Sequence, residues 1–272
     1  MKKWFAVLGN PIHHSISPKM HEQWFRTHQL DASYVPILVE PSHLKESVDS
    51  LALLGCSGFN VTVPFKEAIL PFLDVLDESA LAAGAVNTVV RDQEKWIGYN
   101  TDGLGLLASI PQLTPETRVL IIGAGGAAKG ILAALHQRNV QNITITNRSI
   151  NKMDLLAKQY STSVLDLTKV NENLSQFEVV IQTTSVGMDS TETPVELTNW
   201  NSEMTAVDII YSPPETLFLQ QAKAQGAATM NGLAMLIGQG ALAFELWTGI
   251  KPDQQEIRET IFRQKGETHV NK

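Results

Sequence analysis

The segment Arg118–Leu135, RVLIIGAGGAAKGILAAL, joins a short apolar run, a glycine-rich turn and a helix-forming stretch without interruption. Gly123, Gly125 and Ala128 fit the pattern G-x-G-x-x-A. In such a turn the first glycine permits a tight bend, the second lets the backbone approach a pyrophosphate, and the third position allows close helix–strand packing. Free N–H groups at the helix start attract anions. The segment predicts a strand–turn–helix unit that binds a dinucleotide, with a purely structural glycine turn as the alternative.

The next apolar run along the chain bears on which dinucleotide is bound. Ile143–Thr146 is followed by Asn147, Arg148 and Ser149, and no acidic residue lies where NAD enzymes use one to bind the ribose 2′-hydroxyl. Arg148 could pair with a 2′-phosphate, Asn147 could donate to it, and Lys152 is near enough to add charge. A solvated turn would look the same in isolation. Beside the glycine loop, the pattern favours NADP over NAD.

Strand-like apolar runs alternate with helix-period segments along the whole chain, which predicts an α/β fold with mostly parallel twisted sheets. A second unit is expected to begin after Pro111 and Pro115. The expected strands are 3–8, 34–39, 58–63, 118–122, 143–146, 178–181 and 206–210, with a hairpin formed by 86–91 and 95–99. The expected helices are 18–28, 44–54, one opened by Pro64, one from the glycine turn to Asn139, 233–247 and 252–263.

Length and composition exclude several classes of protein. The 272 residues suffice for two modest domains, and 43% are hydrophobic against 18% charged, which is a globular balance. The net charge of −7 argues against a nucleic-acid partner. No apolar stretch reaches the roughly 18 residues of a membrane span. Cys56 is the only cysteine, which fits a reducing compartment. We therefore expect a cytoplasmic protein that binds small molecules.

The segment GFNVTVPFK, residues 58–66, carries the most distinctive candidate chemistry. Because side chains alternate along a strand, Asn60 and Thr62 share one face, where two hydrogen-bonding groups suit vicinal hydroxyls. The opposite, apolar face is expected to join the core and consists of Phe59, Val61 and Val63. Lys66 follows near the carboxyl end of the strand, where ligands bind in open α/β sheets. An isolated solvent-exposed lysine is the alternative for Lys66.

Two further groups of polar residues follow other predicted strands. Ser15 and Ser17 come after the first strand; Ser17 is the expected N-cap of a helix starting at Pro18, whereas Ser15 has no such structural role. Asn87 lies in an apolar strand and is either a ligand or a backbone cap. Asp102, in NTDG, is either a helix cap or part of a site.

Three histidines recur every seven residues, at His14, His21 and His28. Seven is not a compact chelating spacing, and no cysteine or carboxylate cluster accompanies them. We therefore expect surface or packing histidines and no metal site.

An ordered series of motifs resembles the shikimate dehydrogenase family over nearly the whole chain. The matching segments are GNPIHHSISPKMH, GFNVTVPFKEAIL, GAVNTVV, GYNTDG, GAGGAAKG, NRS, TTSVGM, DIIYSPPET and NGLAMLIGQGALAFELWTG. The resemblance implies NADPH-dependent, reversible reduction of 3-dehydroshikimate to shikimate, a step of chorismate and aromatic amino-acid biosynthesis. It also implies a substrate-binding domain of residues 1–102 plus 237–272, a Rossmann-like NADP domain of residues 103–236, and an active site in the cleft. The protein is expected to be a monomer or homodimer.

The resemblance also assigns roles to residues of this chain. It implies that Lys66 and Asp102 form the catalytic pair and that both also contact substrate. It implies that Ser15, Ser17 and Tyr211 meet the substrate carboxylate, and that its hydroxyl and carbonyl groups are held by Asn60, Thr62, Asn87, Asp102 and Gln239. The implied cofactor contacts are Glu78, the phosphate loop Gly123, Ala124, Gly125, Gly126 and Ala127, the 2′-phosphate loop Asn147, Arg148, Ser149 and Lys152, and the nicotinamide wall Thr184, Ser185, Ile209, Gly232 and Met235.

The sequence departs from the family at Ser149, where a threonine often follows Asn-Arg; serine keeps the hydroxyl. Two alternatives are a quinate/shikimate dehydrogenase that uses NAD and a cofactor-binding sensor without catalysis. An acidic residue in place of Arg148 would favour the first. Loss of Lys66 or Asp102 would favour the second, and both residues are present.

Overall fold

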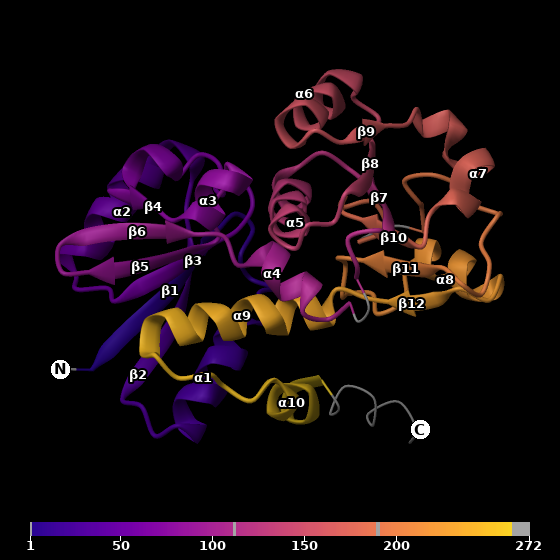
Figure 1. Cartoon of the computed structure of the whole chain (residues 1–272). Coiled ribbons are helices and arrows are strands. Elements are labelled where there is room, and N and C mark those ends of the chain that lie inside the picture. The colour runs from indigo at the N-terminus through magenta and orange to yellow at the C-terminus, as the bar shows by residue number, and fades with distance from the viewer. Residues whose placement is uncertain (1, 111–112, 189–190, 263–272) are drawn as a thin grey trace. The chain divides into compact units, whose positions relative to one another are not determined.

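The computed structural model describes residues 2–110, 113–188 and 191–262, and these form two compact units. The first unit takes the chain up to Gly105 and again from Ile237; the second is Leu106–Leu236. Each is an α/β unit, as the sequence predicts, and is built on a six-stranded sheet (Figure 1). Helix α9 (Leu233–Thr248) begins in the second unit and continues in the first. No described helix is long and apolar enough to cross a bilayer.

The sheet of the first unit has the strand order β2-β1-β3-β5-β6-β4. Its strands are β1 (Lys3–Gly9), β2 (Ala32–Leu38), β3 (Gly58–Val61), β4 (Val75–Leu76), β5 (Thr88–Asp92) and β6 (Lys95–Tyr99). Neighbours are parallel except that β5 runs antiparallel to both β3 and β6. The expected hairpin is therefore confirmed, and the sheet is mixed but mostly parallel.

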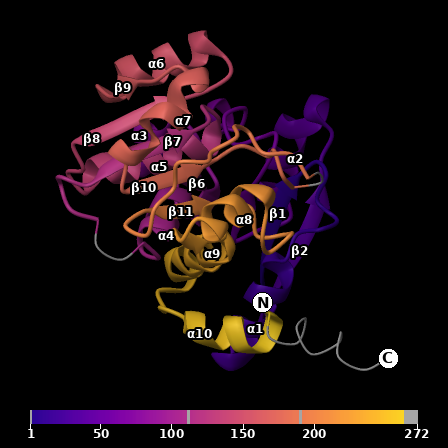
Figure 2. The same ribbon diagram turned by 90° about the vertical axis from the view of Figure 1, so that its right-hand side faces the viewer.

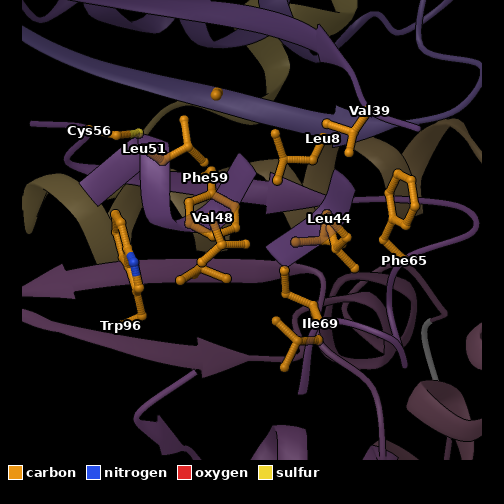
Figure 3. Close-up of a cluster of buried hydrophobic side chains, with 14 of the residues drawn as sticks. Leu8, Val39, Leu44, Val48, Leu51, Cys56, Phe59, Phe65, Ile69 and Trp96 are labelled. Carbon is orange, nitrogen blue, oxygen red and sulfur yellow. The ribbon is translucent and has the colours of Figure 1, made fainter. Parts of the chain in front are cut away.

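The helices of the first unit cover both faces of this sheet. They are α1 (Ser17–Thr27), α2 (Leu44–Leu53), α3 (Glu78–Ala83), α10 (Gln254–Ile257) with a π-helical turn at Arg258–Phe262, and the parts of α4 (Asp102–Leu107) and α9 that belong to this unit. Leu8 and Phe59 face α2, where they join the buried cluster of Figure 3. Phe5 points the other way and stacks on Phe25 of α1 and Trp247 of α9. Helix α10 lies beside α1 in both views (Figures 1 and 2), joined by the Trp24 Nε1 bond to the Asp253 carbonyl.

The second unit is a doubly wound parallel sheet with the order β12-β11-β10-β7-β8-β9. Its elements are β7 (Arg118–Ile122), α5 (Gly126–Gln137), β8 (Asn142–Thr146), α6 (Ile150–Tyr160), β9 (Ser163–Val164), α7 (Val170–Asn173), β10 (Val179–Gln182), β11 (Thr205–Asp208), α8 (Leu217–Ala224) and β12 (Ala228–Met230). The chain winds outward in both directions from β7 and β10, and dinucleotides bind at this switch point in such sheets.

The expectation that Pro64 opens a helix is wrong. The residues after Pro64 form turns and a 3₁₀ helix at Leu70–Phe72, because the Lys66 carbonyl accepts a 2.8 Å bond from the Val86 N–H instead of serving a helical turn. Pro71 lies within the 3₁₀ helix, near its start, where a missing N–H is tolerated. The strand ends at Val61, so Val63 is exposed and does not join the core.

The expectation that Ser17 caps α1 is also wrong. The helix begins at Ser17 itself, so Ser17 is helical rather than extended, and Ile16 holds the cap position without a side-chain bond. The hydroxyl of Ser15 accepts a 3.3 Å bond from the Ser17 N–H, which gives Ser15 the local structural role that we assigned to Ser17.

Other element ends differ from expectation by a few residues, as assignments at helix and strand ends commonly do. The last expected helix, 252–263, begins at Gln254, and its final residue lies outside the described residues. Pro111, expected at the start of the second unit, also lies outside them.

His21 is packed within the core of the first unit. Its side chain is fully buried, its ring lies flat on Tyr34 at 4.5 Å, and neither ring nitrogen has a hydrogen-bond partner among the described residues. His14 is exposed and His28 is partly buried. Within residues 2–110, 113–188 and 191–262, no three His, Cys, Asp or Glu side chains gather as a metal site requires. His21 is a packing residue that burial keeps neutral.

We expect acid to destabilise the protein through His21. Burial lowers the pKa of His21 from 6.5 to about 3, so between these values the unfolded chain takes up a proton that the folded chain does not. Folding stability is therefore lost as the pH falls below about 6.5. At pH 5 the contribution is about 2 kcal/mol. Urea unfolding at pH 7 and pH 5 should show this extra loss in the wild type and not in His21→Phe. Replacement of the exposed His43 by phenylalanine is the control, and equal losses in the wild type and His21→Phe would contradict the account.

Candidate active site

Polar side chains of the first unit collect at one edge of its sheet. Strands β1, β3 and β6 run parallel and end at this edge, and antiparallel β5 begins there. Ser15 and Ser17 follow β1, Thr62 and Lys66 follow β3, Asn87 precedes β5, and Asp102 follows β6. Topology thus brings together residues far apart in sequence, as expected for the ligand-binding edge of such a sheet.

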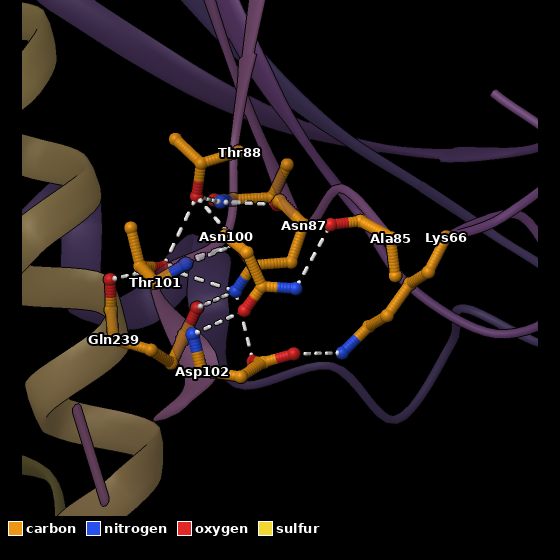
Figure 4. Close-up of polar contacts among 9 residues, drawn as sticks. Lys66, Ala85, Asn87, Thr88, Asn100, Thr101, Asp102 and Gln239 are labelled. Atoms are coloured by element: carbon orange, nitrogen blue, oxygen red, sulfur yellow. Dashed lines mark hydrogen bonds and ion pairs between the residues drawn. The ribbon is translucent and has the colours of Figure 1, made fainter. Parts of the chain in front are cut away.

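Lys66 and Asp102 form an ion pair at this edge of the sheet. Lys66 Nζ lies 2.6 Å from Asp102 Oδ2, and the two side chains are 20% and 6% exposed. The bond from the Val86 N–H to the Lys66 carbonyl fixes the lysine backbone beside Asn87. Asp102 is the first residue of α4, and its N–H bonds to Asn100 Oδ1 at 3.2 Å (Figure 4). One carboxylate oxygen of Asp102 thus contacts the Lys66 ammonium group, and the lysine side chain remains partly exposed to solvent.

Asn87 holds the second carboxylate oxygen of Asp102. Its Nδ2 donates to Asp102 Oδ1 at 2.8 Å and to Thr101 Oγ1 at 3.0 Å, while its Oδ1 accepts from the Thr101 N–H at 2.8 Å (Figure 4). Gln239 Oε1, on α9, lies 3.5 Å from the same Nδ2. The amide therefore orients Asp102, and three of the expected site residues, Asn87, Asp102 and Gln239, lie in one cluster.

Asn60 and Thr62 differ although both were expected to meet substrate. Asn60 is 6% exposed, and its amide bonds to the Tyr34 hydroxyl at 2.7 Å, to Thr88 Oγ1 at 3.0 Å and to the Asn87 carbonyl at 3.0 Å. Both amide hydrogens are thus donated within the protein, and only the amide oxygen keeps capacity for a further bond. Thr62 is half-buried, and no described residue hydrogen-bonds to its hydroxyl. The structure thus leaves the Thr62 hydroxyl available to a ligand.

Ser15 and Ser17 lie together at the start of α1, half-buried. The Ser17 side chain hydrogen-bonds to Tyr34, whose pKa is raised well above its usual value by burial. Tyr211, the third residue expected at the substrate carboxylate, belongs to the second unit and is half-buried; burial raises its pKa as well. The phenol groups of both tyrosines therefore stay protonated at neutral pH.

Three members of this cluster were not expected from the sequence. Thr88 and Thr101 place their hydroxyls 3.2 Å apart beside Asn87, and Asn100 bridges the Ala85 carbonyl and the Asp102 N–H. Thr101 and Asn100 stand directly before Asp102 in the motif NTDG, and Thr88 directly follows Asn87. Their position next to Asn87 and Asp102 in the sequence could have indicated that they belong to the site, but their hydrogen-bond partners are determined only by the fold.

The glycine loop of the second unit has the shape that a pyrophosphate needs. Gly123 has φ +123°, and a Cβ there would lie 2.4 Å from Thr183 Oγ1. Gly125 holds the N-cap position of α5 and has no side chain that could bond to the free N–H groups of the helix. A Cβ at Gly125 or Gly126 would meet nothing within 4 Å. Ala124 and Ala127 are partly exposed beside them. An uncapped helix start under open space fits the phosphates of a dinucleotide.

The segment expected at the 2′-phosphate lies at the end of β8. Arg148 and Ser149 are exposed, Lys152 is exposed in the first turn of α6, and Asn147 donates to the Ser149 carbonyl at 3.1 Å. Ser149 holds the cap position of α6 without a side-chain bond. Two cations at an uncapped helix start suit a phosphate. Glu78, the remaining expected cofactor contact, belongs to the first unit and is exposed at the first position of α3.

Residues expected around the nicotinamide follow β10 and β11. Thr184 and Ser185 lie in the loop after β10, with the Thr184 hydroxyl accepting from the Val186 N–H at 3.2 Å. Ile209 directly follows β11. Gly232 donates to the Ile210 carbonyl at 2.9 Å and approaches Ile209 so closely that a Cβ would lie 1.9 Å from its carbonyl oxygen. Met235, on α9, is almost buried.

Comparison with known proteins finds relatives along nearly the whole chain. Three family models match in order: "Shikimate dehydrogenase substrate binding domain" at residues 7–89, "Shikimate / quinate 5-dehydrogenase" at 106–212 and "Shikimate 5'-dehydrogenase C-terminal domain" at 232–262. The chain belongs to the shikimate dehydrogenase family. Shikimate dehydrogenase (NADP(+)) of Geobacillus sp. (strain WCH70) is 41% identical to it over 274 residues, covering 97% of this chain and 99% of the relative.

Solved structures of family members agree with this assignment. Shikimate 5-dehydrogenase from Thermus thermophilus, in complex with NADP(H) and shikimate, superposes with a TM-score of 0.88 at 34% identity, covering 96% of this chain and 99% of that one. Quinate dehydrogenase from Corynebacterium glutamicum, in complex with NAD, has a TM-score of 0.88 at 29% identity, with coverages of 96% and 99%. The shared fold thus accompanies different cofactors and substrates.

Proposed function

We propose that the protein is an NADP-dependent shikimate dehydrogenase that reversibly reduces 3-dehydroshikimate to shikimate. The observation that carries the proposal is the Lys66–Asp102 ion pair, 2.6 Å long and anchored by Asn87 at the ligand-binding edge of the first sheet. A cofactor-binding sensor without catalysis would have no use for such a pair. The loop containing Arg148 supports NADP as the cofactor.

Lys66 and Asp102 carry the proton chemistry in this proposal. NADPH, when bound, supplies the hydride that reduces the substrate ketone to an alcohol. The new hydroxyl needs a proton, and the Lys66 ammonium both polarises the ketone oxygen and donates to it. Asp102 orients the ammonium through its 2.6 Å contact and accepts a hydrogen bond from a neighbouring substrate hydroxyl. In the oxidative direction the same groups take the proton away.

The remaining groups position the reactants. Ser15, Ser17 and Tyr211 bind the substrate carboxylate, and Thr62, Asn87 and Gln239 hold its hydroxyl groups. Asn60 stabilises this group of residues through its bonds to Tyr34 and Thr88. Residues 1–102 with 237–272 form the substrate-binding domain and residues 103–236 the NADP domain. Such an enzyme would work as a monomer or homodimer, and the single cysteine suits the cytoplasm.

The test is turnover by the purified protein with two substrates and two cofactors. Shikimate and quinate are each incubated with NADP+ and with NAD+, and nicotinamide reduction is followed by absorbance. We expect the highest kcat/KM for shikimate with NADP+. Faster turnover of quinate with NAD+ would show that the protein is a quinate/shikimate dehydrogenase that uses NAD. Absence of turnover in all four combinations would favour a cofactor-binding sensor without catalysis.

Thr62→Val should weaken substrate binding more than chemistry. The replacement keeps the shape of the side chain and removes the hydroxyl that protein groups leave unused. A hydrogen bond between neutral groups is worth ~0.5–1.5 kcal/mol, so KM for shikimate should rise about two- to tenfold while kcat changes little. Thr168→Val, on the surface of the second unit, is the matched control. Unchanged shikimate affinity by calorimetry would remove Thr62 from the site.

A further inference from the structure

Two fully buried polar side chains lie at the carboxyl ends of neighbouring strands in the second unit. Gln182 is the last residue of β10 and Asp208 the last of β11, and neither is exposed. Gln182 Nε2 lies 3.4 Å from Asp208 Oδ1. Burying polar groups costs free energy unless hydrogen bonds within the protein replace those that the groups made with water. The partners of these two side chains therefore indicate why they are buried here.

The bonds of this pair go to the two loops that follow the strands. Gln182 donates to the carbonyls of Thr184 and Val186 at 3.2 and 3.1 Å and accepts from the Thr184 N–H. Asp208 Oδ1 accepts from the Ile210 N–H at 2.9 Å, and Oδ2 accepts from the Thr216 hydroxyl at 2.6 Å. Gln182 therefore holds the loop after β10, Asp208 holds the loop after β11, and their mutual 3.4 Å bond links the two loops.

The carboxylate of Asp208 is costly to bury. Burial raises the pKa of Asp208 to about 6, and its hydrogen bonds with Thr216 and Ile210 oppose that rise. Among residues 2–110, 113–188 and 191–262, no lysine or arginine forms an ion pair with it. An apolar side chain would pack here without the cost of burying a carboxylate. We therefore attribute the presence of Asp208 to the hydrogen bonds by which it orders the neighbouring loops.

We propose that Asp208 is a positioning residue for the nicotinamide half of NADP(H), acting through the loops at 183–187 and 209–211. The inference rests on the proposed function, which puts Thr184, Ser185 and Ile209 around the nicotinamide. Gly232 joins the same arrangement through the Ile210 carbonyl. Within the described residues Asp208 hydrogen-bonds neither to the glycine loop nor to Asn147–Lys152. It therefore acts on one end of the cofactor and not on the other.

Asp208→Asn tests the proposal, because it keeps the shape and removes the charge and one acceptor. Calorimetry compares NADP+ with adenosine 2′,5′-bisphosphate, which has the 2′-phosphate end but no nicotinamide. We expect the affinity for the fragment to stay within about twofold and kcat/KM for NADP+ to fall about tenfold or more, as for the loss of a bond to a charged group. The fall should be equal with NAD+, so cofactor preference should not change.

Three further variants make the result specific. Asp166→Asn is the matched control, since the exposed Asp166 accepts from the Thr168 N–H and hydroxyl at 2.8 and 2.6 Å in a similar local arrangement. Thr216→Val removes the hydroxyl that donates to Asp208 and should give the result expected for Asp208→Asn, so the proposal can be tested even if Asp208→Asn does not fold. Thr216→Ser keeps the hydroxyl and should behave like the wild type.

Equal weakening of the fragment and NADP+ would overturn the proposal, because it would indicate general loosening of the unit. Unchanged NADP+ kinetics and binding would overturn it as well. Binding of the two ligands can be compared even if shikimate is not turned over, so failure of the proposed function is a separate result.

Discussion

Lys66→Ala should lower kcat by about 10²- to 10⁴-fold while changing KM for shikimate much less. General acid catalysis contributes a factor of this size, and proton transfer is felt in the transition state more than in the ground state. The variant also leaves Asp102, which is 6% exposed, without its cation. Steady-state kinetics in both directions measure the effect, and thermal unfolding checks that the variant is folded.

The chain provides a matched control for this substitution. Lys45 and Asp49 also form a 2.7 Å ion pair, but their side chains are 66% and 58% exposed on the surface of α2. Lys45→Ala should leave both kinetic constants unchanged, since exposed pairs contribute little. A raised KM with unchanged kcat in Lys66→Ala would make Lys66 a binding residue only, and the proton would need another donor.

Arg148→Asp should reverse or greatly reduce the preference for NADP(H). A guanidinium binds phosphate through charge-assisted bonds worth ~1.5–3 kcal/mol, or roughly tenfold to a hundredfold in affinity. An aspartate at this exposed position repels the 2′-phosphate and can accept from a ribose hydroxyl instead. Arg148→Ala should have a smaller effect, because Lys152 still supplies positive charge.

The ratio of kcat/KM for the two cofactors is the quantity to measure, at fixed ionic strength because salt screens exposed charges. Lys158→Asp, exposed in the last turn of α6, the helix that follows this loop, changes the net charge equally and should leave the ratio unchanged. A wild type that uses NAD as well as NADP, or an Arg148→Asp variant with an unaltered ratio, would show that this loop does not read the 2′-phosphate.

The features predicted best from the sequence are those set by neighbouring residues. The strand, glycine turn and helix of Arg118–Leu135 are confirmed because local apolar pattern and backbone freedom determine them together. The prediction of a helix after Pro64 was wrong because a residue far along the chain determines the structure there. Nothing in the residues after Pro64 shows that the Lys66 carbonyl bonds to Val86, twenty residues later, instead of forming a helix.

The candidate site shows the same division. Lys66 and Asp102 were chosen from motifs 36 residues apart, and the fold brings their charged atoms to 2.6 Å. Asn60 was chosen from the alternation of side chains along its strand, but its bonds to Tyr34 and Thr88 depend on strands that only the sheet brings together. Gln182 and Asp208 were not singled out, because a glutamine and an aspartate at strand ends give no signal until their burial is known.

The decisive experiment is reduction of 3-dehydroshikimate by NADPH in the presence of the purified wild-type protein. NADPH oxidation is followed by absorbance, and the product is identified by mass spectrometry against authentic shikimate. We expect one shikimate formed for each NADPH oxidised, with little activity in Lys66→Ala. A protein that binds NADPH but oxidises none of it with this substrate, or that yields another product, would contradict the account.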